Sequence, residues 1–264
     1  MEWIFLSPHF DDAVFSCGGL IWELTSKGDR VQIWTICAGE IPQGELSAYA
    51  EEHHLRWNTG SDTIAVRRME DLRSCKVVSA SYYHFPLPDC IYRRAGDNYW
   101  TAGQSSATNL ANREEHLYTS NEALFGPVHP AERELIQQLS DRIAILVPSG
   151  AEVVCPLTIG GHADHRLTRL AAEQTGKRLW YYADFPYVLT NWDKLNTFIE
   201  PGWKLRRFNL SPLGLQAWGD AVSRHASQIS TFWSDVNAMR QELGAYHQKL
   251  NGTMLWRKAL SESL

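Results

Sequence analysis

No stretch of the sequence is apolar for long enough to cross a bilayer, which takes roughly 20 consecutive apolar residues. The first apolar run, residues 3–6, ends before Pro8 and has no basic residues in front of it, so it does not match a secretory signal peptide. We therefore expect no transmembrane segment and a cytoplasmic location.

Cysteines are few, widely spread and never arranged as a C-x-x-C pair. An odd number without paired spacing argues against a disulfide framework and favours reduced thiols. We expect these side chains to be structural and chemically inert. The five cysteines are Cys17, Cys37, Cys75, Cys90 and Cys155.

Positive charge is not in excess, because 25 Lys and Arg residues stand against 30 Asp and Glu residues, a formal net charge of −5. This balance excludes a general electrostatic attraction to nucleic acid, so we expect no nucleic-acid partner. A G-x-G-x-x-G motif is also missing after the first predicted strand, which excludes a nicotinamide cofactor bound there. With 264 residues, 44% of them hydrophobic, the chain is long enough for one large domain with a sizeable core.

A polar motif does stand between a predicted strand at residues 3–6 and a predicted helix at residues 20–27. Its His and Asp side chains are groups that bind divalent metals or move protons. The plain alternative for this motif alone is a capped helix start, since Asp satisfies free backbone amides there. The motif reads Ser7-Pro8-His9-Phe10-Asp11-Asp12 and continues to Cys17-Gly18-Gly19, whose glycines suit a tight loop.

A second polar motif, Gly160-Gly161-His162-Ala163-Asp164-His165, also follows a predicted strand, at residues 153–157, and precedes a predicted helix at residues 166–175. Alone, it is as well explained by a polar surface. If both strands end at the same edge of a parallel sheet, His9, Asp12 and His165 form a set of two histidines and one carboxylate, which is typical of a catalytic zinc with an open position for water. The joint occurrence of the two motifs favours a metal site.

The remaining chain predicts alternating strands and helices. We expect an α/β fold, a Rossmann-like three-layer sandwich with a mostly parallel central sheet and a C-terminal helical extension. Residues 1–264 would form a single domain, with a catalytic core in 1–190 and a C-terminal strand and helices in 191–264 that close the cleft or pair with a second subunit, which leaves a homo-oligomer open. Further expectations are a loop over 37–63, a charged helix over 63–78, a strand over 81–85, an insertion over 91–128 that walls the cleft, a helix over 130–145, strands over 178–183 and 204–210, and helices over 213–232 and 236–250.

The two motifs together resemble the LmbE-like, or PIG-L, family of zinc-dependent deacetylases, whose signatures are Pro-His-Pro-Asp-Asp and His-x-Asp-His. The resemblance extends to about residue 190, through Ala38-Gly39-Glu40, Arg67 to Glu70, Leu87-Pro88-Asp89 and Tyr181-Tyr182-Ala183-Asp184-Phe185-Pro186. Phe10 stands where proline is usual in the family. Gly160 stands where some members have a tyrosine, so oxyanion stabilisation would rest on zinc and His162, or on a tyrosine from elsewhere.

The resemblance implies roles for particular residues. His9, Asp12 and His165 would bind zinc, although iron(II) suits the same ligands. Asp11 would be the general base, and His162 would stabilise the oxyanion or protonate the amine. Arg67 would contact the sugar or aglycone, and the alternative is an ion pair with Glu70 on a helix surface. Glu40 and Asp89 are further substrate-binding candidates, for which a turn is the alternative. Asp164 is a third catalytic candidate, since its carboxylate could accept a hydrogen bond from His162 and keep it protonated.

The function implied is hydrolysis of an N-acetyl group from an N-acetylglucosamine-containing small molecule or glycoconjugate, by zinc-activated water. The expected partner is therefore a small N-acetylated amino sugar or glycoside. Two alternatives remain at this level: an amidase of the same family that acts on a larger thiol-sugar conjugate, and a carbohydrate-binding protein without turnover.

Overall fold

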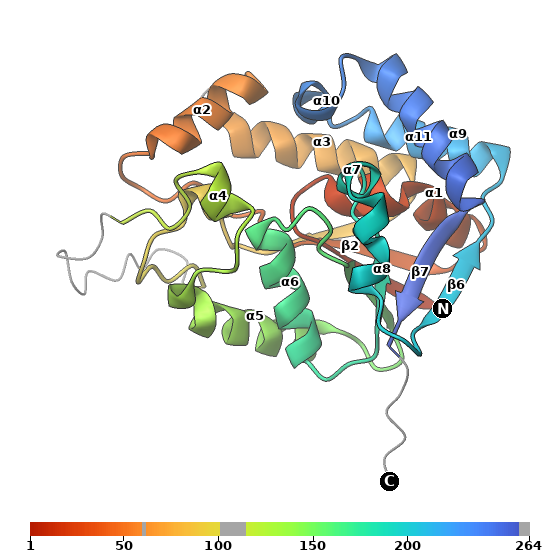
Figure 1. Ribbon diagram of the computed structural model, residues 1–264, viewed down its shortest axis with the longest axis horizontal. Helices are drawn as coiled ribbons and strands as arrows, with labels where there is room; N and C mark the ends of the chain where they lie inside the picture. The colour runs from red at the N-terminus through yellow and green to blue at the C-terminus, as the bar shows by residue number, and fades with distance from the viewer. Residues whose placement is uncertain (60–61, 101–114, 259–264) are drawn as a thin grey trace, which may run out of the picture.

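The strands form one mixed sheet in the part of the chain that the computed structural model describes, residues 1–59, 62–100 and 115–258 (Figure 1). The sheet order is β3-β2-β1-β4-β5-β7-β6. The first five strands run parallel, whereas β7 is antiparallel to both of its neighbours. The mostly parallel sheet is thus confirmed. The strands are β1 (Glu2–Ser7), β2 (Arg30–Thr35), β3 (Ser81–His84), β4 (Glu152–Pro156), β5 (Leu179–Tyr182), β6 (Lys204–Phe208) and β7 (Thr253–Arg257).

Helices cover both faces of the sheet and complete the three layers. Figure 1 shows α5 and α6 below the sheet and α1, α3, α9 and α11 above it. The longer helices are α1 (Asp12–Ser26), α2 (Ala48–Trp57), α3 (Thr63–Val77), α5 (Arg133–Leu146), α6 (Ala163–Gln174), α9 (Pro212–Val222), α10 (Ala226–Phe232) and α11 (Val236–Leu250). Short helical turns are η2 (Cys90–Tyr92), α4 (Asn121–Leu124), η4 (Pro130–Glu132), α7 (Tyr187–Thr190), η5 (Trp192–Lys194) and α8 (Leu195–Phe198). No helix of the described residues is long and apolar enough to cross a membrane.

From β1, the next strands in the chain are added on one side, as β2 and β3, and then on the other side, as β4 and β5. β1 and β4 are therefore direct neighbours, although about 150 residues separate them. The helix after β1 lies on one face and the helix after β4 on the other. The chain segments that follow β1 and β4 therefore diverge at the carboxyl ends of these strands. The crevice between them is where sheets of this kind usually bind ligands. Both polar motifs begin there.

The central strands are buried on both faces, and accordingly read as nearly continuous apolar runs such as Trp3-Ile4-Phe5-Leu6. The core continues into the C-terminal helices, where Trp218 and Tyr246 pack against Phe185. A Cβ atom at Gly18 would lie 2.6 Å from Trp218 Cδ1. Gly18 thus serves the close packing of α1 against α9 rather than the tight loop expected from the sequence. All five cysteines are buried and unpaired.

Several sequence expectations need correction. The loop expected over 37–63 contains α2, whose start is capped by the Ser47 hydroxyl and whose buried face is Ala50, His53 and Trp57. The helix expected over 213–232 is interrupted between α9 and α10. Strand β7 was not predicted as a separate element. Of the insertion over 91–128, residues 101–114 lie outside the described residues; the described part contains α4 and lines the cleft with Ile91, Leu124 and Phe125.

Candidate active site

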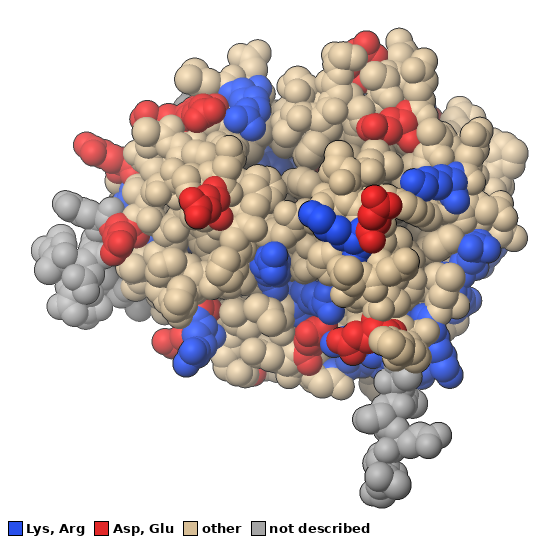
Figure 2. Space-filling view, in the orientation of Figure 1, with Lys and Arg blue, Asp and Glu red and all other residues tan. Residues whose placement is uncertain are grey.

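A pocket opens at the carboxyl edge of β1 and β4. It lies between the loops that follow these strands and is roofed by α2 and α10, and Figure 2 shows the molecule hollowed between these two helices with basic atoms at its floor. On the face in Figure 2 acidic and basic side chains are interspersed, with no continuous basic patch. Of the predicted site residues, those that line the pocket are His9, Asp11, Asp12, Arg67, Asp89 and His162.

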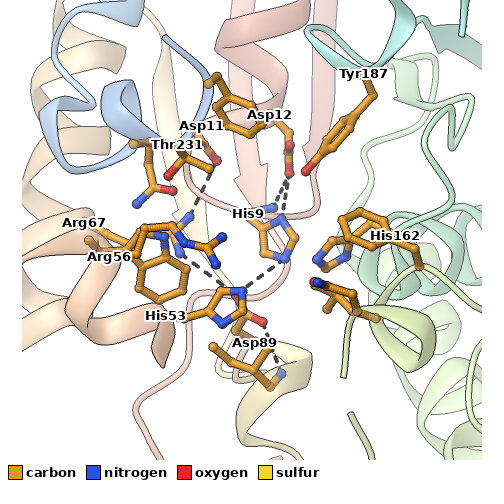
Figure 3. Close-up of a pocket in the computed structure, with 17 residues that line it drawn as sticks. His9, Asp11, Asp12, His53, Arg56, Arg67, Asp89, His162, Tyr187 and Thr231 are labelled. Carbon is orange, nitrogen blue, oxygen red and sulfur yellow. Dashed lines mark hydrogen bonds and ion pairs between the residues drawn. The ribbon is translucent and has the colours of Figure 1, made fainter. Parts of the chain in front are cut away.

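The Asp12 carboxylate lies between the two histidines predicted to share a metal with it. Its Oδ2 atom is 3.1 Å from His9 Nδ1, and its Oδ1 atom is 3.2 Å from His165 Nε2 (Figure 3 shows the His9 contact). The His9 backbone N–H also donates to Asp12 Oδ2 at 2.7 Å, which fixes the carboxylate at the start of α1. The structure thus brings the two motifs together as the sequence predicted.

The two ring nitrogens of His165 indicate whether these residues can bind a cation. Its Nδ1 hydrogen bonds to Asp184 Oδ1 at 2.7 Å, so the neutral ring carries its hydrogen there and leaves the lone pair on Nε2. That Nε2 atom is buried, faces Asp12 and has no hydrogen-bond partner among the described residues. A buried imidazole lone pair beside a carboxylate, with the other ring nitrogen held by a second carboxylate, is the arrangement of a metal ligand. The residues present therefore fit a divalent metal.

The electrostatics of this cluster also favour bound positive charge. Burial alone lowers the pKa of His165, but the nearby carboxylates of Asp12 and Asp184 raise it to about 9. For His9, burial is likewise opposed by Asp89, Asp12 and Asp164, which raise its pKa well above the ordinary value. Burial would raise the pKa of Asp12, but His165 and His9 hold it well below its usual range. Protons and a metal compete for the same lone pairs, so a cation bound here would replace these protons.

His162 caps the start of α6, where its Nδ1 atom accepts the backbone N–H of Asp164 at 3.2 Å. Burial, followed by repulsion from His9, places the pKa of His162 well below its ordinary value. The neutral ring therefore carries its hydrogen on Nε2 and offers a donor to the pocket. This differs from the expectation that the Asp164 carboxylate keeps His162 protonated, because that carboxylate points elsewhere. Ligand atoms of His9, His162 and His165 also lie within 4.8 Å of one another.

Asp164 lies behind the pocket rather than on its surface. Its fully buried carboxylate is 3.0 Å from His9 Nε2, accepts the backbone N–H of Cys90 and lies 2.5 Å from Arg93 Nη1. Arg93 is itself buried and pairs with Glu132 at 2.5 Å. Neither Arg93, in the insertion, nor Glu132, just after it, was a sequence candidate, because nothing local marks them as a buried pair behind the second motif.

Asp11 faces the pocket beside Arg67, with 3.6 Å between Asp11 Oδ1 and Arg67 Nη2. Burial and then the charge of Asp12 raise the pKa of Asp11 to about 6, against the lowering effect of Arg67. The Arg67 guanidinium lies over the Trp57 ring, 4.9 Å from its centroid, and 3.9 Å from Asp89 Oδ2. Its Nε atom is buried and has no hydrogen-bond partner in the part of the chain that the structure describes. Arg67 is thus held in place, and its Nε–H group remains available as a hydrogen-bond donor.

The structure excludes one alternative and one expectation for charged residues. Arg67 and Glu70 do not form a surface ion pair, since both are buried and Glu70 accepts two hydrogen bonds from Ser227 on α10. Glu40 is not brought to the pocket, because its side chain is 73% exposed and pairs with Arg68 at 2.8 Å.

The other walls of the pocket come from residues that carry no local motif. Asp184 is not part of the wall but holds His165. It follows β5 at the same sheet edge as the two motifs and belongs to the stretch 181–186 that resembles the family, and these two signals could have marked it. The residues of α2 and α10 gave no such signal, since their helices pack over the site from distant parts of the chain. The additional lining residues are His53, Arg56, Trp57, Asn121, Tyr187, Gln228, Thr231 and Phe232.

A model of the PIG-L family, described as GlcNAc-PI de-N-acetylase, matches residues 4–175. The chain is 24% identical over 217 residues to a 2'-N-acetylparomamine deacetylase of Niallia circulans, with 76% of this chain and 71% of that protein covered. It is 28% identical over 191 residues to a 2'-N-acetylparomamine deacetylase of Streptomyces fradiae, with 70% and 57% covered. Among solved structures, the zinc-inhibited form of a teicoplanin deacetylase superposes with a TM-score of 0.74 at 24% identity, over 99% of this chain and 100% of that one.

The family match covers well over half of the chain and includes both polar motifs. The chain therefore belongs to the PIG-L family, as its motifs suggested, and the structural similarity confirms the α/β fold.

Proposed function

We propose that the protein is a metal-dependent hydrolase that removes the N-acetyl group from an N-acetylglucosamine-containing small molecule or glycoconjugate. The observation that carries the proposal is the Asp12 carboxylate held between His9 Nδ1 and Nε2 of His165, with the Asp11 carboxylate beside it and paired with Arg67. The deacetylase names of the two related proteins and of the matching family support the type of reaction.

His9, Asp12 and His165 would hold the metal, with zinc as the first choice for two imidazoles and one carboxylate. A divalent cation bound there supplies Lewis acidity, which polarises an amide carbonyl and makes water more acidic. His162 remains a hydrogen-bond donor, because its Nδ1 atom already accepts the Asp164 amide.

Asp11 is placed to act as the general base. It lines the pocket one residue before a ligand, and its own carboxylate pairs with Arg67 (Figure 3). A pKa near 6 suits a group that is ionised at neutral pH and can take a proton from attacking water and deliver it to the leaving amine.

The sugar would bind between two unlike walls. Arg67 and Asp89 offer a donor and an acceptor for sugar hydroxyls on one side. Leu124, Phe125 and Phe232 form an apolar wall that suits the flat face of a sugar ring or an aglycone.

Acetate release tests the proposal. Zinc-loaded protein should release acetate from a panel of N-acetylglucosaminides and lose this activity after chelation, with recovery on zinc addition. Asp11→Asn should abolish release while the metal content stays that of the parent, whereas Asp141→Asn, on the exposed side of α5, should change neither. Absence of release from every substrate, or equal release by Asp11→Asn, would contradict the proposal. Faster release of a larger acid than of acetate would instead indicate an amidase.

A further inference from the structure

Phe10 stands at the centre of the first polar motif, between His9 and Asp11, where the family usually has proline. Its two neighbours line the pocket, whereas Phe10 does not and is only 1% exposed. A phenyl ring neither binds a metal nor transfers a proton. The groups packed around this ring therefore indicate what it contributes to the site.

The Phe10 ring lies against the guanidinium of Arg67. Arg67 Cζ lies over this ring, 5.6 Å from its centroid, and over the Trp57 ring at 4.9 Å. An aromatic face attracts a cation within about 6 Å, and the attraction grows where water is excluded. All three residues are buried, so both rings stabilise the guanidinium in its present place.

The carboxylates beside Arg67 balance its charge but do not fix its orientation. Asp11 Oδ1 and Asp89 Oδ2 lie 3.6 and 3.9 Å from its Nη atoms, whereas an N–H···O hydrogen bond spans about 2.7 to 3.2 Å (Figure 3). The N–H groups of a guanidinium lie in one plane, so the tilt of that plane decides which of them face a ligand. The aromatic contacts are the closer constraint on this tilt.

The Phe10 ring is itself anchored to α3, the helix that carries Arg67. It packs at 90° against the His84 ring, with centroids 5.3 Å apart, and His84 Nε2 hydrogen bonds to Asp71 Oδ2 at 2.6 Å. Asp71 is fully buried and lies one turn after Arg67 on the same helix. The helix therefore holds both the guanidinium and, through Asp71 and His84, the ring against which it packs.

We propose that Phe10, together with Trp57, is a positioning residue that orients the Arg67 guanidinium for the hydroxyl groups of the sugar, and so sets substrate affinity. Phe10 does not line the pocket and acts through Arg67. Proline has no aromatic face, so this contact depends on the residue by which the chain departs from the family signature. The inference rests on the proposed function, which it deepens by naming what holds the sugar-binding arginine.

Phe10→Leu tests the inference, because it keeps an apolar side chain and removes the ring. We expect KM to rise about 3- to 10-fold with kcat within about 2-fold, since a buried cation–π contact is lost while the metal ligands remain. Metal content should equal that of the parent. Phe208→Leu is the matched control, because Arg206 lies over the Phe208 ring at 4.5 Å outside the pocket, and its KM should be that of the parent.

Two further measurements separate positioning from packing. A trifluorinated phenylalanine at position 10 nearly keeps the shape of the ring but withdraws the electron density that attracts the cation, so KM should rise with it too. In the Arg67→Met background, Phe10→Leu should leave KM where it is, because the group that the ring orients is gone.

The outcomes separate the inference from the proposed function. If the parent releases acetate, an unchanged KM for both replacements of Phe10, or the same rise in the Arg67→Met background, overturns the inference alone. Loss of metal or of kcat with KM intact would also overturn it, since Phe10 would then only support the motif. If no substrate is hydrolysed, the proposed function fails, and the dissociation constants of the same compounds decide the inference: equal affinity of parent and Phe10→Leu, or no binding at all, contradicts it.

Discussion

His9 and Asp164, one from each polar motif, are joined inside the protein by a 3.0 Å contact between Nε2 and Oδ2. If Nε2 carries the ring hydrogen and donates it to Asp164, the lone pair of Nδ1 is left facing Asp12. His165 is held in the same manner by Asp184, with the two nitrogens exchanged. Each predicted ligand histidine therefore has a carboxylate behind it, which fixes its tautomer and raises its basicity.

Asp164→Asn should weaken metal binding without removing a ligand. The amide keeps the shape of the side chain but lacks the charge that holds His9, and loss of such a partner typically costs about 10- to 100-fold in metal affinity. Zinc affinity measured in chelator-buffered solution checks this, with Asp141→Asn as the exposed control. An unchanged dissociation constant for zinc would show that Asp164 does not position His9.

Arg93→Met should destabilise the protein strongly. Arg93 is fully buried between Asp164 and Glu132, so its removal leaves two buried carboxylates without their cation, a change that typically costs about 3–5 kcal/mol. Urea unfolding of the metal-free protein gives this free energy directly. Arg56→Met is the comparison, since its pairing with Glu52 is exposed and is worth only about 0.3–0.5 kcal/mol. Equal losses for both variants would mean that the buried network does not hold the fold.

The sequence could predict the elements in which local pattern and tertiary role agree. β1 and β4 are short apolar runs followed at once by polar residues, and a parallel sheet brings such ends to one edge. That is why His9, Asp12 and His165 were found from the sequence and lie together in the structure.

The pocket walls could not be predicted because their residues meet only through distant packing. α10 reaches the site because Glu70 of α3 binds Ser227, which is 157 positions away. α2 buries only a narrow face, which includes His53 and Trp57. Its sequence therefore lacks a clear helical repeat of apolar residues and resembles that of a loop. In both cases tertiary contact, rather than local propensity, decides where the helix lies.

Arg67→Met should move the acid limb of the pH–rate profile to higher pH. Ionised Asp11 is needed as a base, so the rate falls as pH drops through the pKa of Asp11. Arg67, 3.6 Å from Asp11, lowers that pKa, whereas burial and Asp12 raise it. Removing the positive charge therefore raises the pKa, and more of the base is protonated at a given pH.

The measurement for Arg67→Met is kcat/KM from about pH 5 to about pH 8 with metal saturating in both proteins. Arg68→Met is the matched control, because Arg68 pairs with exposed Glu40 and lies outside the pocket. An acid limb that stays in place, or moves to lower pH, would rule out Asp11 as the group that titrates.

Ser227→Ala should weaken substrate binding although Ser227 does not line the pocket. Its backbone N–H and hydroxyl donate to Glu70 at 2.8 and 2.6 Å and tie α10 to α3. Loss of the hydroxyl leaves one carboxylate oxygen of buried Glu70 unpaired, a penalty of about 1–3 kcal/mol that favours loosening of α10. We expect KM to rise roughly 3- to 10-fold, part of that penalty, with kcat nearly unchanged. Faster amide hydrogen exchange in α10 should accompany it. Ser234→Ala, whose hydroxyl bonds to the adjacent exposed Asp235, should leave KM and exchange as they are. A KM for Ser227→Ala that matches this control would show that α10 is held by its apolar contacts instead.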